Sequence, residues 1–475
     1  MSTTVLPIPE RWPHLLLPAA SYDRGPDAVP VTDLRAAVAA GAFAGLKKAL
    51  REMSAGEVVA ALARSGLRGR GGSGFPTSEK WRACALAQAD RRYVVVHAYQ
   101  ADPGVFAERV LLERNPYAVL EGAAIAALAV DASEIVFAVR ADAVEAVATV
   151  EAAAREAEKA GYLGPNVLGS GREIAVRVVP LRGAYMLGEE TVLLAAIEGR
   201  RGQPEQQPPY PSTKGLYGKP TLVHNPQTLA VVPSVLTGRP AGEPAAEKPA
   251  GRLAGTRVGA TSHQIAAQAE TAPDSSQGTI LVQVSGSVVK PGLVEVPIGI
   301  SLGDILALAG GVPGSHSLKA LLVGGPSGGI LPASAVKTEY QFETLRDAGA
   351  HMGSGSVVAI DERTCLVDLA STLTRFCADQ ACGKTIPCRI GLRRLAEIGA
   401  RISEGQPRGD EVTRLTDLSA DISASRLCSH EGNSTLPLLS LVRYFRDELD
   451  AHLLHSTCPT GTCRMPAMPR GRAGS

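Results

Sequence analysis

Apolar and polar positions alternate with two different periods in the first half of the chain. Between residues 30 and 65 apolar side chains recur at helical spacing, and Ser54 followed by Glu57 offers a helix cap before the second run. Short β-branched runs, typical of buried parallel strands, follow at 93–96, 135–139 and 174–179. Ala-rich helical stretches lie between them at about 116–129 and 142–160. Strands that alternate with helices predict an α/β sheet covered on both faces.

The second half of the chain has a different pattern. Residues 235–278 are rich in Ala, Gly, Pro and Ser without a sustained period, which predicts a flexible linker. Residues 280–286 then alternate, a turn follows at 290–292, and a second strand and a short helix complete a small β-grasp-like module. From about 364 to 454 amphipathic helices recur, and one of their faces carries Leu392, Leu395, Ile398 and Ile402. This region is predicted to be a helical bundle.

Composition narrows the classes of protein. A chain of 475 residues has room for about three domains, and its 45% apolar and 20% charged residues exclude wholesale disorder, a collagen and a membrane-spanning bundle. The 48 Lys and Arg against 47 Asp and Glu leave a charge of +1, so no whole-chain charge favours nucleic acid or an anionic membrane as partner. Prolines interrupt the only candidate for a signal segment. We therefore expect a cytoplasmic chain without a membrane span.

Residues 66–77 form the first candidate site. This segment carries five glycines together with Arg68 and Arg70, and a helix can begin at Ser78. Glycines allow main-chain amides to approach a phosphate, and the two arginines and Lys80 add positive charge. The segment is predicted to bind an anion, with a plain structural turn as the alternative. Its glycine spacing matches neither the dinucleotide fingerprint nor the P-loop.

The second and third candidates are an acidic turn and a cysteine cluster. Glu189 and Glu190 follow Gly188 where a strand gives way to a helix, so they either accept hydrogen bonds from ribityl or ribose hydroxyls or cap the helix. Seven of the eight cysteines lie in the last quarter of the chain. In Cys382–Cys388 and Cys428, thiolates either bind an iron–sulfur cluster or lie reduced in the bundle. Cys458 and Cys463, near the end, either ligate a metal or belong to a frayed terminus.

Together these motifs resemble one family, the NADH-oxidising flavoprotein subunit of respiratory complex I and its relatives in soluble NAD-linked hydrogenases and formate dehydrogenases. The resemblance runs in order from about residue 40 to 455. It rests on the segments 66–77, 188–191, 198–204, 215–221 and 382–389. It implies five regions: a Rossmann-like FMN/NADH-binding α/β domain with N-terminal helices, a flexible linker, a β-grasp soluble-ligand-binding module, an iron–sulfur helical bundle and a flexible tail. Their expected bounds are 1–234, 235–278, 279–345, 346–455 and 456–475.

The resemblance also implies a function. Such a chain is an NADH dehydrogenase-like oxidoreductase that passes electrons from NAD(P)H through FMN to a [4Fe–4S] cluster, or to a three-ligand or three-iron variant of it. The implied partner is a small thioredoxin-like or ferredoxin iron–sulfur subunit, within a larger redox complex or at the inner face of the membrane through its partners. The alternative is a degenerate, non-catalytic paralogue that serves as an assembly scaffold.

The resemblance implies site residues wherever a position of this chain matches a motif of the family. It implies a catalytic role for none of them. Cofactor contacts are expected from the glycine-rich segment, the acidic turn and a few flanking positions: Gly69, Arg70, Gly71, Gly72, Lys80, Asp102, Gly188, Glu189, Glu190, Thr191, Asn225 and Thr228. NADH is expected to lie nearest Phe75, Glu190 and Tyr210. Cys382, Cys388 and Cys428 are the expected cluster ligands, with Cys377 as a fourth.

The chain departs from the family pattern at both sites. Where the family has an Asn-Ala-Asp-Glu-x-Glu-Pro-Gly segment, His97, Tyr99 and Gln100 replace polar contacts and only Asp102 keeps a carboxylate. Gln207 and Ala83 replace an expected lysine and an expected aromatic residue. The middle cysteine of the family's Cys-x2-Cys-x2-Cys motif is replaced by a threonine at position 385. These changes motivate the scaffold alternative.

Overall fold

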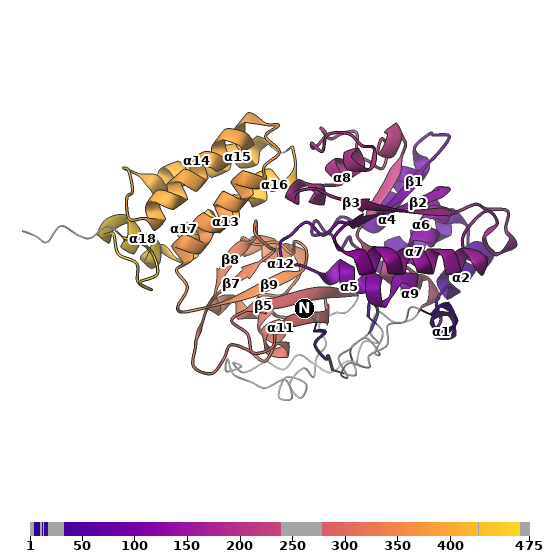
Figure 1. Ribbon diagram of the computed structural model, residues 1–475, viewed down its shortest axis with the longest axis horizontal. Helices are drawn as coiled ribbons and strands as arrows, with labels where there is room; N and C mark the ends of the chain where they lie inside the picture. Colours follow the sequence, from indigo (N-terminus) through magenta and orange to yellow (C-terminus); the bar gives the residue numbers. More distant parts are fainter. Residues whose placement is uncertain are drawn as a thin grey trace, which may run out of the picture.

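Three modules make up the described part of the chain. The structure is a computed structural model that describes residues 4–9, 12, 14–17, 33–238, 278–425 and 427–465. The predicted flexible linker lies outside the described residues except at its two ends, as do residues 466–475 of the predicted tail. An α/β domain, a second smaller sheet and a helical bundle follow one another along the chain and meet side by side (Figure 1).

A parallel four-stranded sheet forms the centre of the first module. Its order is β3-β2-β1-β4, and its members are β1 (Tyr93–Ala98), β2 (Glu134–Arg140), β3 (Ala175–Leu181) and β4 (Thr221–His224). Side chains alternate along β1: Val94 and Val96 pack into one apolar cluster, whereas Tyr93 and Val95 pack into another on the opposite face. Both faces are therefore covered, as the hydrophobic pattern predicts.

Helices cover the two faces and the edges of this sheet. They are α1 (Leu34–Ala39), α2 (Ala44–Glu52), α3 (Ala55–Ser65), α4 (Thr77–Leu86), α5 (Ala107–Arg114), α6 (Pro116–Val130), α7 (Val144–Lys159), α8 (Glu190–Ile197) and α9 (Pro226–Thr237). Short 3-10 turns lie at Val167–Gly169, Tyr185–Gly188 and Leu216–Gly218. The predicted cap of α3 is confirmed as a capping box, because Ser54 Oγ accepts the Glu57 N–H while Glu57 Oε2 accepts the Ser54 N–H.

Helices α6 and α9 cross at a glycine. A Cβ added at Gly122 would lie 1.9 Å from the carbonyl oxygen of Leu229, so the two backbones are in direct contact. We expect Gly122→Ala to lower the free energy of unfolding by about 3 kcal/mol, because the helices must move apart. Urea denaturation measures the change. Gly56→Ala is the matched control, since exposed Gly56 on α3 has nothing near its Cβ position and should gain about 0.5–1 kcal/mol. A Gly122→Ala protein as stable as its parent would contradict the close crossing.

The second module is a mixed five-stranded sheet in the order β6-β5-β9-β7-β8. Its strands are β5 (Thr279–Gly286), β6 (Gly292–Pro297), β7 (Leu318–Val323), β8 (Gly329–Pro332) and β9 (Ser356–Asp361), with α11 (Leu302–Leu308), a 3-10 turn at Ala333–Lys337 and α12 (Phe342–Asp347). Strand β9 pairs parallel to β5 and antiparallel to β7. This sheet therefore continues beyond residue 345, into the segment 346–455 that the resemblance assigns to the bundle.

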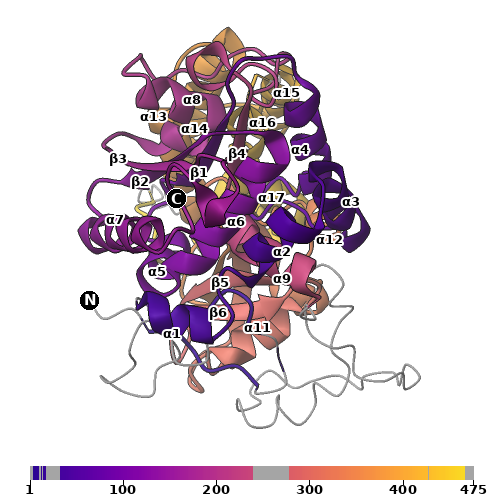
Figure 2. The same cartoon turned by 90° about the vertical axis from the view of Figure 1, so that its right-hand side faces the viewer.

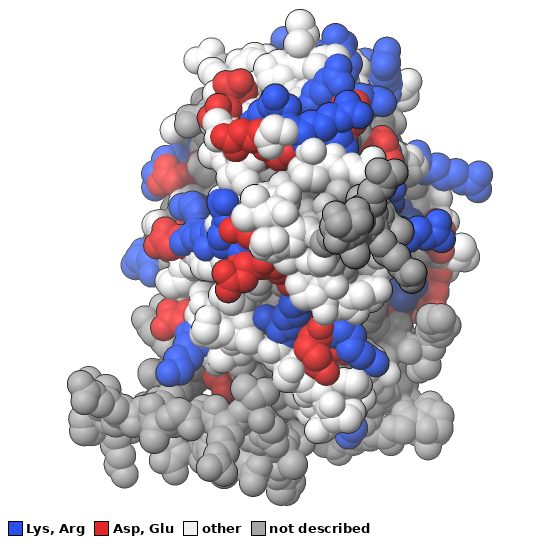
Figure 3. Space-filling model, turned by 90° about the vertical axis from the view of Figure 1, so that its left-hand side faces the viewer, with Lys and Arg blue, Asp and Glu red and all other residues white. Residues whose placement is uncertain are grey.

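The third module is the helical bundle. It contains α13 (Leu366–Gln380), α14 (Ile386–Ser403), α15 (Glu411–Ser425), α16 (Ser429–Asn433), α17 (Leu436–Tyr444) and α18 (Arg446–His455). The predicted apolar face of α14 is buried in its core. In the described residues, no helix combines the length and the apolar composition that a bilayer crossing requires. Acidic and basic side chains are intermixed on the end of the molecule that the bundle forms (Figure 3).

The three modules share apolar clusters. Leu281 of β5 and Leu293 of β6 pack into the core of the α/β domain, and these strands lie beneath that domain in Figure 2. Leu322 and Ile330, on the other side of the same sheet, pack into the core of the bundle. The bundle also reaches the α/β domain directly, through the loop that carries Cys382. The modules therefore meet at one junction, where the candidate site lies.

Candidate functional site

The glycine-rich loop joins α3 to α4 and is closed by its own backbone. Gly69 N–H donates to the Phe75 carbonyl at 2.9 Å, and Thr77 N–H donates to the Leu67 carbonyl at 3.0 Å. The Arg70 N–H donates to Thr228 Oγ1 at 2.8 Å, and a Cβ added at Gly71 would lie 3.6 Å from that of Asn225, the N-cap of α9. The structure thus brings together the predicted contacts of this loop and those of the segment 225–228.

The other side of the loop packs against the second module. Gly72 has φ +104°, and a Cβ there would lie 2.9 Å from the carbonyl oxygen of Gly353. Gly74 has φ +64°, and its Cβ would lie 2.6 Å from the Phe342 ring. Side chains are therefore excluded at both positions by backbone conformation and by space. The second module therefore packs directly against this side of the loop.

Arg70 is buried and faces away from the loop's open side. Its Nε donates to the Thr279 carbonyl at 3.1 Å and its NH1 to the Arg68 carbonyl at 2.6 Å. Burial and the nearby charge of Arg68 lower the pKa of Arg70 to about 10, so the guanidinium stays charged at neutral pH. This side chain, which the resemblance assigns to the cofactor, fastens the loop to the first residue of β5.

Lys80 and Thr77 offer hydrogen-bond donors beside the loop. Lys80 Nζ donates to Glu190 Oε2 at 2.9 Å and to the Val223 carbonyl at 3.1 Å, which leaves one of its three N–H groups. Among the described residues, the buried hydroxyl of Thr77 has no hydrogen-bond partner. Buried polar groups ordinarily have one. These donors, next to glycine amides, fit the phosphate of a flavin mononucleotide.

The two carboxylates of the acidic turn make different contacts. Glu189 is the N-cap of α8, and its Oε2 accepts the Val192 N–H at 2.9 Å. Glu190 instead faces Lys80. The carbonyl of Gly188 accepts a hydrogen bond from His97 Nε2 at 3.0 Å, and burial lowers the pKa of His97, so this imidazole is neutral at pH 7. The helix-capping interpretation is therefore right for Glu189 alone.

A buried carboxylate that the sequence did not reveal lies behind this site. Glu108 on α5 accepts hydrogen bonds from Asn225 Nδ2 at 2.9 Å and from Gln227 Nε2 at 3.1 Å, and also from Gln100. Burial raises the pKa of Glu108. Gln100, which departs from the family pattern, thus has a partner of its own in this network. Sequence offers no signal for Glu108 beyond an acid in the first turn of a helix.

Three further predicted contacts are Asp102, Phe75 and Tyr210. Asp102 accepts a hydrogen bond from Ser354 and faces Gly325 in the second module, and burial raises its pKa. Phe75 and Tyr210 are 52% and 56% exposed, so their rings are available to a planar ligand. Gln207 Nε2 lies 3.5 Å from Glu190 Oε1.

The predicted cluster cysteines lie where the bundle touches α8. Cys388 is buried in the first turn of α14, whereas Cys382 and Cys428 pack against the apolar cluster that α8 forms with the parallel sheet. Burial raises the pKa of Cys388 to about 12, and the nearby Cys428, Cys382 and Cys377 contribute to this rise. The four predicted ligands thus lie in one region of the protein, although not as a compact set.

The position of the missing cysteine has a carboxylate beside it. Thr385 Oγ1 donates to Glu431 Oε1, and Glu431 Oε2 accepts the Leu427 N–H at 2.6 Å. Glu431 is only 2% exposed. The Sγ of Cys377 is 3.7 Å from the Pro326 carbonyl. Sequence reasoning missed Glu431, which follows Cys428 by three residues.

Aromatic rings bridge the flavin side and the cysteine side. The Tyr185 ring, directly before the acidic turn, meets Phe376 and His430 of the bundle edge to face, at centroid distances of 5.3 and 5.7 Å. His430 Nε2 donates to the carbonyl of Cys377 at 3.0 Å. Lys384, in the cysteine loop, donates to the Pro204 carbonyl. The two candidate sites are therefore in contact through several elements.

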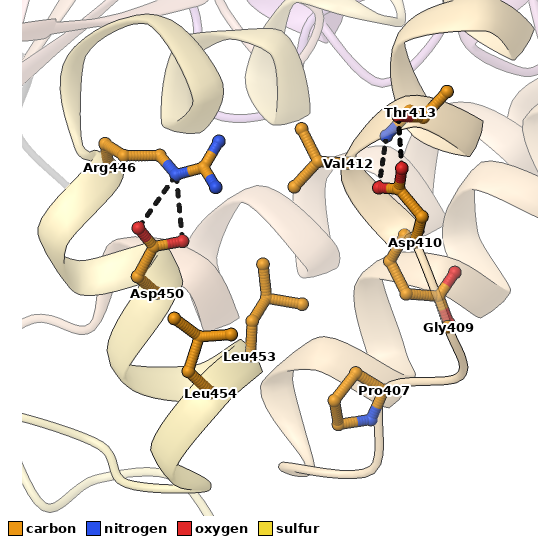
Figure 4. A pocket seen from close by; sticks show the side chains of 10 residues that line it. Pro407, Gly409, Asp410, Val412, Thr413, Arg446, Asp450, Leu453 and Leu454 are labelled. Atoms are coloured by element: carbon orange, nitrogen blue, oxygen red, sulfur yellow. Dashed lines mark hydrogen bonds and ion pairs between the residues drawn. The ribbon is translucent and has the colours of Figure 1, made fainter.

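A hollow of about 530 Å³ lies elsewhere, between α15 and α18 of the bundle (Figure 4). Two of its acidic side chains have partners: Arg446 Nε donates to both oxygens of Asp450 at 2.8 and 2.9 Å, and Asp410 Oδ1 accepts the Thr413 N–H at 3.0 Å. The hollow plays no part in the site described above.

His224 should make stability depend on pH. It is buried, Trp81 Nε1 donates to its Nε2 at 2.8 Å, and burial together with the charge of Lys80 lowers its pKa well below 6.5. Between that pKa and 6.5 only the unfolded chain binds the proton, so His224 destabilises the fold as pH falls below 6.5. Relative to His224→Gln, the parent should lose up to about 1.4 kcal/mol per pH unit. Urea denaturation at pH 7.5 and 5.5 tests this, because the other histidines contribute equally to both proteins.

Comparison with known proteins identifies the family. Residues 62–234 match the Nuo51 FMN-binding domain, residues 281–331 the SLBB domain, and residues 368–452 the NADH-ubiquinone oxidoreductase-F iron-sulfur binding region. An NADH-quinone oxidoreductase subunit from Rhizobium meliloti (strain 1021) is 36% identical over 422 residues, which cover 89% of this chain and 94% of that protein. The chain belongs to the family of NADH-binding flavoprotein subunits of respiratory complex I.

Hydrogenase proteins are also similar to this chain. The NADP-reducing hydrogenase subunit HndC of Solidesulfovibrio fructosivorans is 36% identical over 89% of this chain and 81% of its own length. A crystal structure of an NAD+-reducing [NiFe]-hydrogenase in the H2-reduced state superposes with a TM-score of 0.71 at 30% identity. That match covers 87% of this chain but 64% of the hydrogenase chain, so this chain spans less than two thirds of that one.

These findings decide several predictions about this member of the family. The predicted family and the fold class are confirmed, as are FMN and an iron–sulfur cluster as the cofactors of its domains. The individual contact residues and ligands stay predictions, and so do the exact domain bounds. The relatives carry subunit names, which supports the coarser expectation of partner subunits.

Proposed function

We propose that this chain passes electrons from NAD(P)H through FMN to an iron–sulfur cluster and on to a partner iron–sulfur protein. One observation carries the proposal: Cys382 and Cys428 pack against the same apolar cluster as α8, whose first turn pairs Glu190 with Lys80. The two candidate cofactor sites therefore share a wall. Such closeness is what transfer between two redox centres requires.

The chain's own residues supply binding and orientation at the flavin site. Bound FMN supplies the conversion between two-electron and one-electron transfer. The amides of Gly71 and Gly72, the Lys80 ammonium and the hydroxyl of Thr77 would hold its phosphate, while Glu190 keeps the ammonium in place. Asn225 and Thr228 fix the loop against α9. The exposed rings of Phe75 and Tyr210 receive the dinucleotide.

Three thiolates and one further group hold the cluster. Cys382, Cys388 and Cys428 keep the family's ligand positions, and thiolates suit iron–sulfur clusters. Two side chains compete for the fourth place. Cys377 contributes a sulfur close enough to Cys388 to affect its pKa. Glu431 contributes a buried carboxylate in contact with Thr385, which stands where the family has its middle cysteine. A carboxylate ligand there would change the cluster's reduction potential.

The partner and the location belong to the same proposal. The partner is a small thioredoxin-like or ferredoxin iron–sulfur subunit within a larger redox complex. The proposed location is the cytoplasm, where such partners hold the chain at the inner face of the membrane. The mixed charges on the bundle's end of the molecule favour pairing with a partner that carries both signs (Figure 3).

The second candidate function is a non-catalytic assembly scaffold. Two departures from the family pattern favour it. The side-chain amide of Gln100 donates to Glu108 and is therefore not available to a cofactor, and Thr385 stands where the family has a cysteine ligand. A scaffold would keep the contacts among the modules without binding flavin. The two candidates therefore differ in cofactor content, which is directly measurable.

Anaerobic purification followed by flavin and iron analysis tests the proposal. We expect FMN and iron in the purified full-length protein, thermal stabilisation by added FMN, and reduction of an artificial dye that depends on NADH or NADPH. Dye reduction would exclude the scaffold. A chain that takes up no FMN on reconstitution, and is not stabilised by it, would refute electron transfer and support the scaffold.

A further inference from the structure

Four metal-ligating side chains from distant parts of the chain meet at the end of the bundle where α18 lies (Figure 1). Cys365, His452, Cys458 and Cys463 each offer one ligand atom, and these atoms lie within 4.8 Å of one another. Cys365 Sγ is 3.5 Å from His452 Nε2, and all three thiols are free. Among the residues that the structure describes, no other set of three or more His, Cys, Asp or Glu ligand atoms is so compact.

The close spacing of these four ligand atoms distinguishes this group from an iron–sulfur cluster site. A cubane binds each thiolate through a different iron atom, so its ligand sulfurs stand well apart. A single tetrahedral ion with Zn–S bonds of about 2.3 Å draws its ligand sulfurs to about 3.8 Å from one another. Cys382, Cys388 and Cys428, which lie against α8, do not form such a compact set. The four ligand atoms therefore suit one ion rather than a cluster.

The imidazole is already oriented as a ligand. His452 is fully buried on α18, and its Nδ1 donates to the Glu448 carbonyl at 2.9 Å, which leaves Nε2 with a free lone pair on the side of Cys365. The carboxylate of Glu448 accepts the Leu366 N–H at 2.9 Å and pairs with Lys319 at 2.8 Å. Because Leu366 follows Cys365, one glutamate positions two of the four ligands.

The loop after α18 brings the last two cysteines back to the bundle. Ser456 adopts a left-handed conformation, and Gly461 (φ +69°) donates its N–H to the Cys458 carbonyl at 3.0 Å, which turns the chain so that Cys463 returns toward Cys458. Thr460 Oγ1 lies 3.2 Å from Cys458 Sγ. Both cysteines pack against the bundle core. This loop has no helix or strand of its own to hold it.

We propose that Cys365, His452, Cys458 and Cys463 bind one structural Zn²⁺ ion. Three thiolates and one imidazole in tetrahedral arrangement are a ligand set that zinc prefers, and four protein ligands leave no open position for catalysis. The ion fastens the loop after α18 to the start of α13. Its contribution is to stability, since the unfolded chain has no preformed site.

Metal analysis of the full-length protein, purified anaerobically, tests the assignment. We expect about one zinc per chain in addition to iron. Cobalt(II) introduced in place of zinc should give the thiolate charge-transfer and intense visible bands of a tetrahedral site. Cys463→Ser should lower the zinc content at least about tenfold and leave iron and FMN unchanged. Cys388→Ser should lower the iron content and leave the zinc content unchanged. The zinc result is therefore independent of the proposed electron transfer.

Matched variants keep the test decisive. His452→Gln should lose zinc like Cys463→Ser, whereas Cys84→Ser, which changes a buried cysteine on α4 far from this group in the sequence, should keep it. Retention of zinc by both ligand variants would overturn the assignment. If the ligand variants fail to fold, the cobalt spectrum of the parent decides, and the absence of tetrahedral thiolate bands overturns it. A disulfide between Cys458 and Cys463 in the purified protein, seen by mass spectrometry, also overturns it.

Discussion

Cys388→Ser is expected to leave the protein with less than about a tenth of its iron and without a cluster signal in electron paramagnetic resonance after reduction. Cys388 is 3% exposed, and the nearby Cys428, Cys382 and Cys377 contribute to its raised pKa. Serine preserves the volume of the side chain but is a poor ligand for iron. Iron analysis and the resonance spectrum of the anaerobically purified variant measure the loss.

Cys84→Ser is the matched control for this prediction. Cys84 is also fully buried, on α4, and burial raises its pKa to about 12, as for Cys388. The two cysteines therefore resemble each other in everything except their neighbours. Equal iron contents in the two variants would show that the ligand assignment is wrong.

The fourth ligand is decided by a second pair of variants. If Glu431 ligates, Glu431→Gln changes the spectrum and shifts the reduction potential, while Cys377→Ser changes neither. If Cys377 ligates, the two results are exchanged. Thr385→Cys, which restores the family's middle cysteine, should bring the spectrum closer to that of a four-thiolate cluster. None of these three substitutions changes a predicted flavin contact, so the FMN content of each variant serves as the internal control.

Lys80→Met is expected to weaken FMN binding about 10- to 150-fold, because a charge-assisted hydrogen bond is worth about 1.5–3 kcal/mol. Lys80 has one N–H group left for the phosphate, and without it Glu190 would face that phosphate unpaired. Quenching of flavin fluorescence in a titration of the apoprotein gives the dissociation constants. Lys80→Arg, which keeps the charge, should lose less.

Lys159→Met controls for the loss of a lysine as such. Lys159 lies exposed in the last turn of α7, far in the sequence from the glycine-rich loop, and its replacement should leave FMN affinity unchanged. Melting temperatures of the apoproteins show whether Lys80→Met has disturbed the fold. An FMN affinity that Lys80→Met does not alter would remove this side chain from the phosphate site.

Local pattern was enough to predict most of the parallel sheet and its helices. Val94 and Val95 point to opposite faces because the strand period is two, and Ser54 caps α3 because its partner is three residues away. Each of these features depends on neighbours in the chain. The glycine-rich loop was equally recognisable, since its composition is itself the signal.

The misses share a different cause. Glu108 bonds to Asn225, 117 residues further on, and Cys365 meets His452 across 87 residues. No periodicity or spacing reports such pairs, and a glutamate in sequence is ordinarily assigned to solvent. Thr385 was visible as a departure, but the carboxylate beside it became apparent only when the fold brought Glu431 to that position. The place of strand β9 in the second sheet was not predicted, because its partners β5 and β7 both precede it in the chain by long intervals.

The seating of the glycine-rich loop on Gly353 and Phe342, with Arg70 bonded to Thr279, has a consequence for dissecting the protein. A fragment cut at residue 234 would contain every predicted flavin contact, yet would lack the surface against which the loop is shaped. Binding of FMN to the fragment would then also have to order that loop, and the entropy lost in doing so would weaken the binding. Modular as the sequence looks, its cofactor affinity is a property of the joined chain.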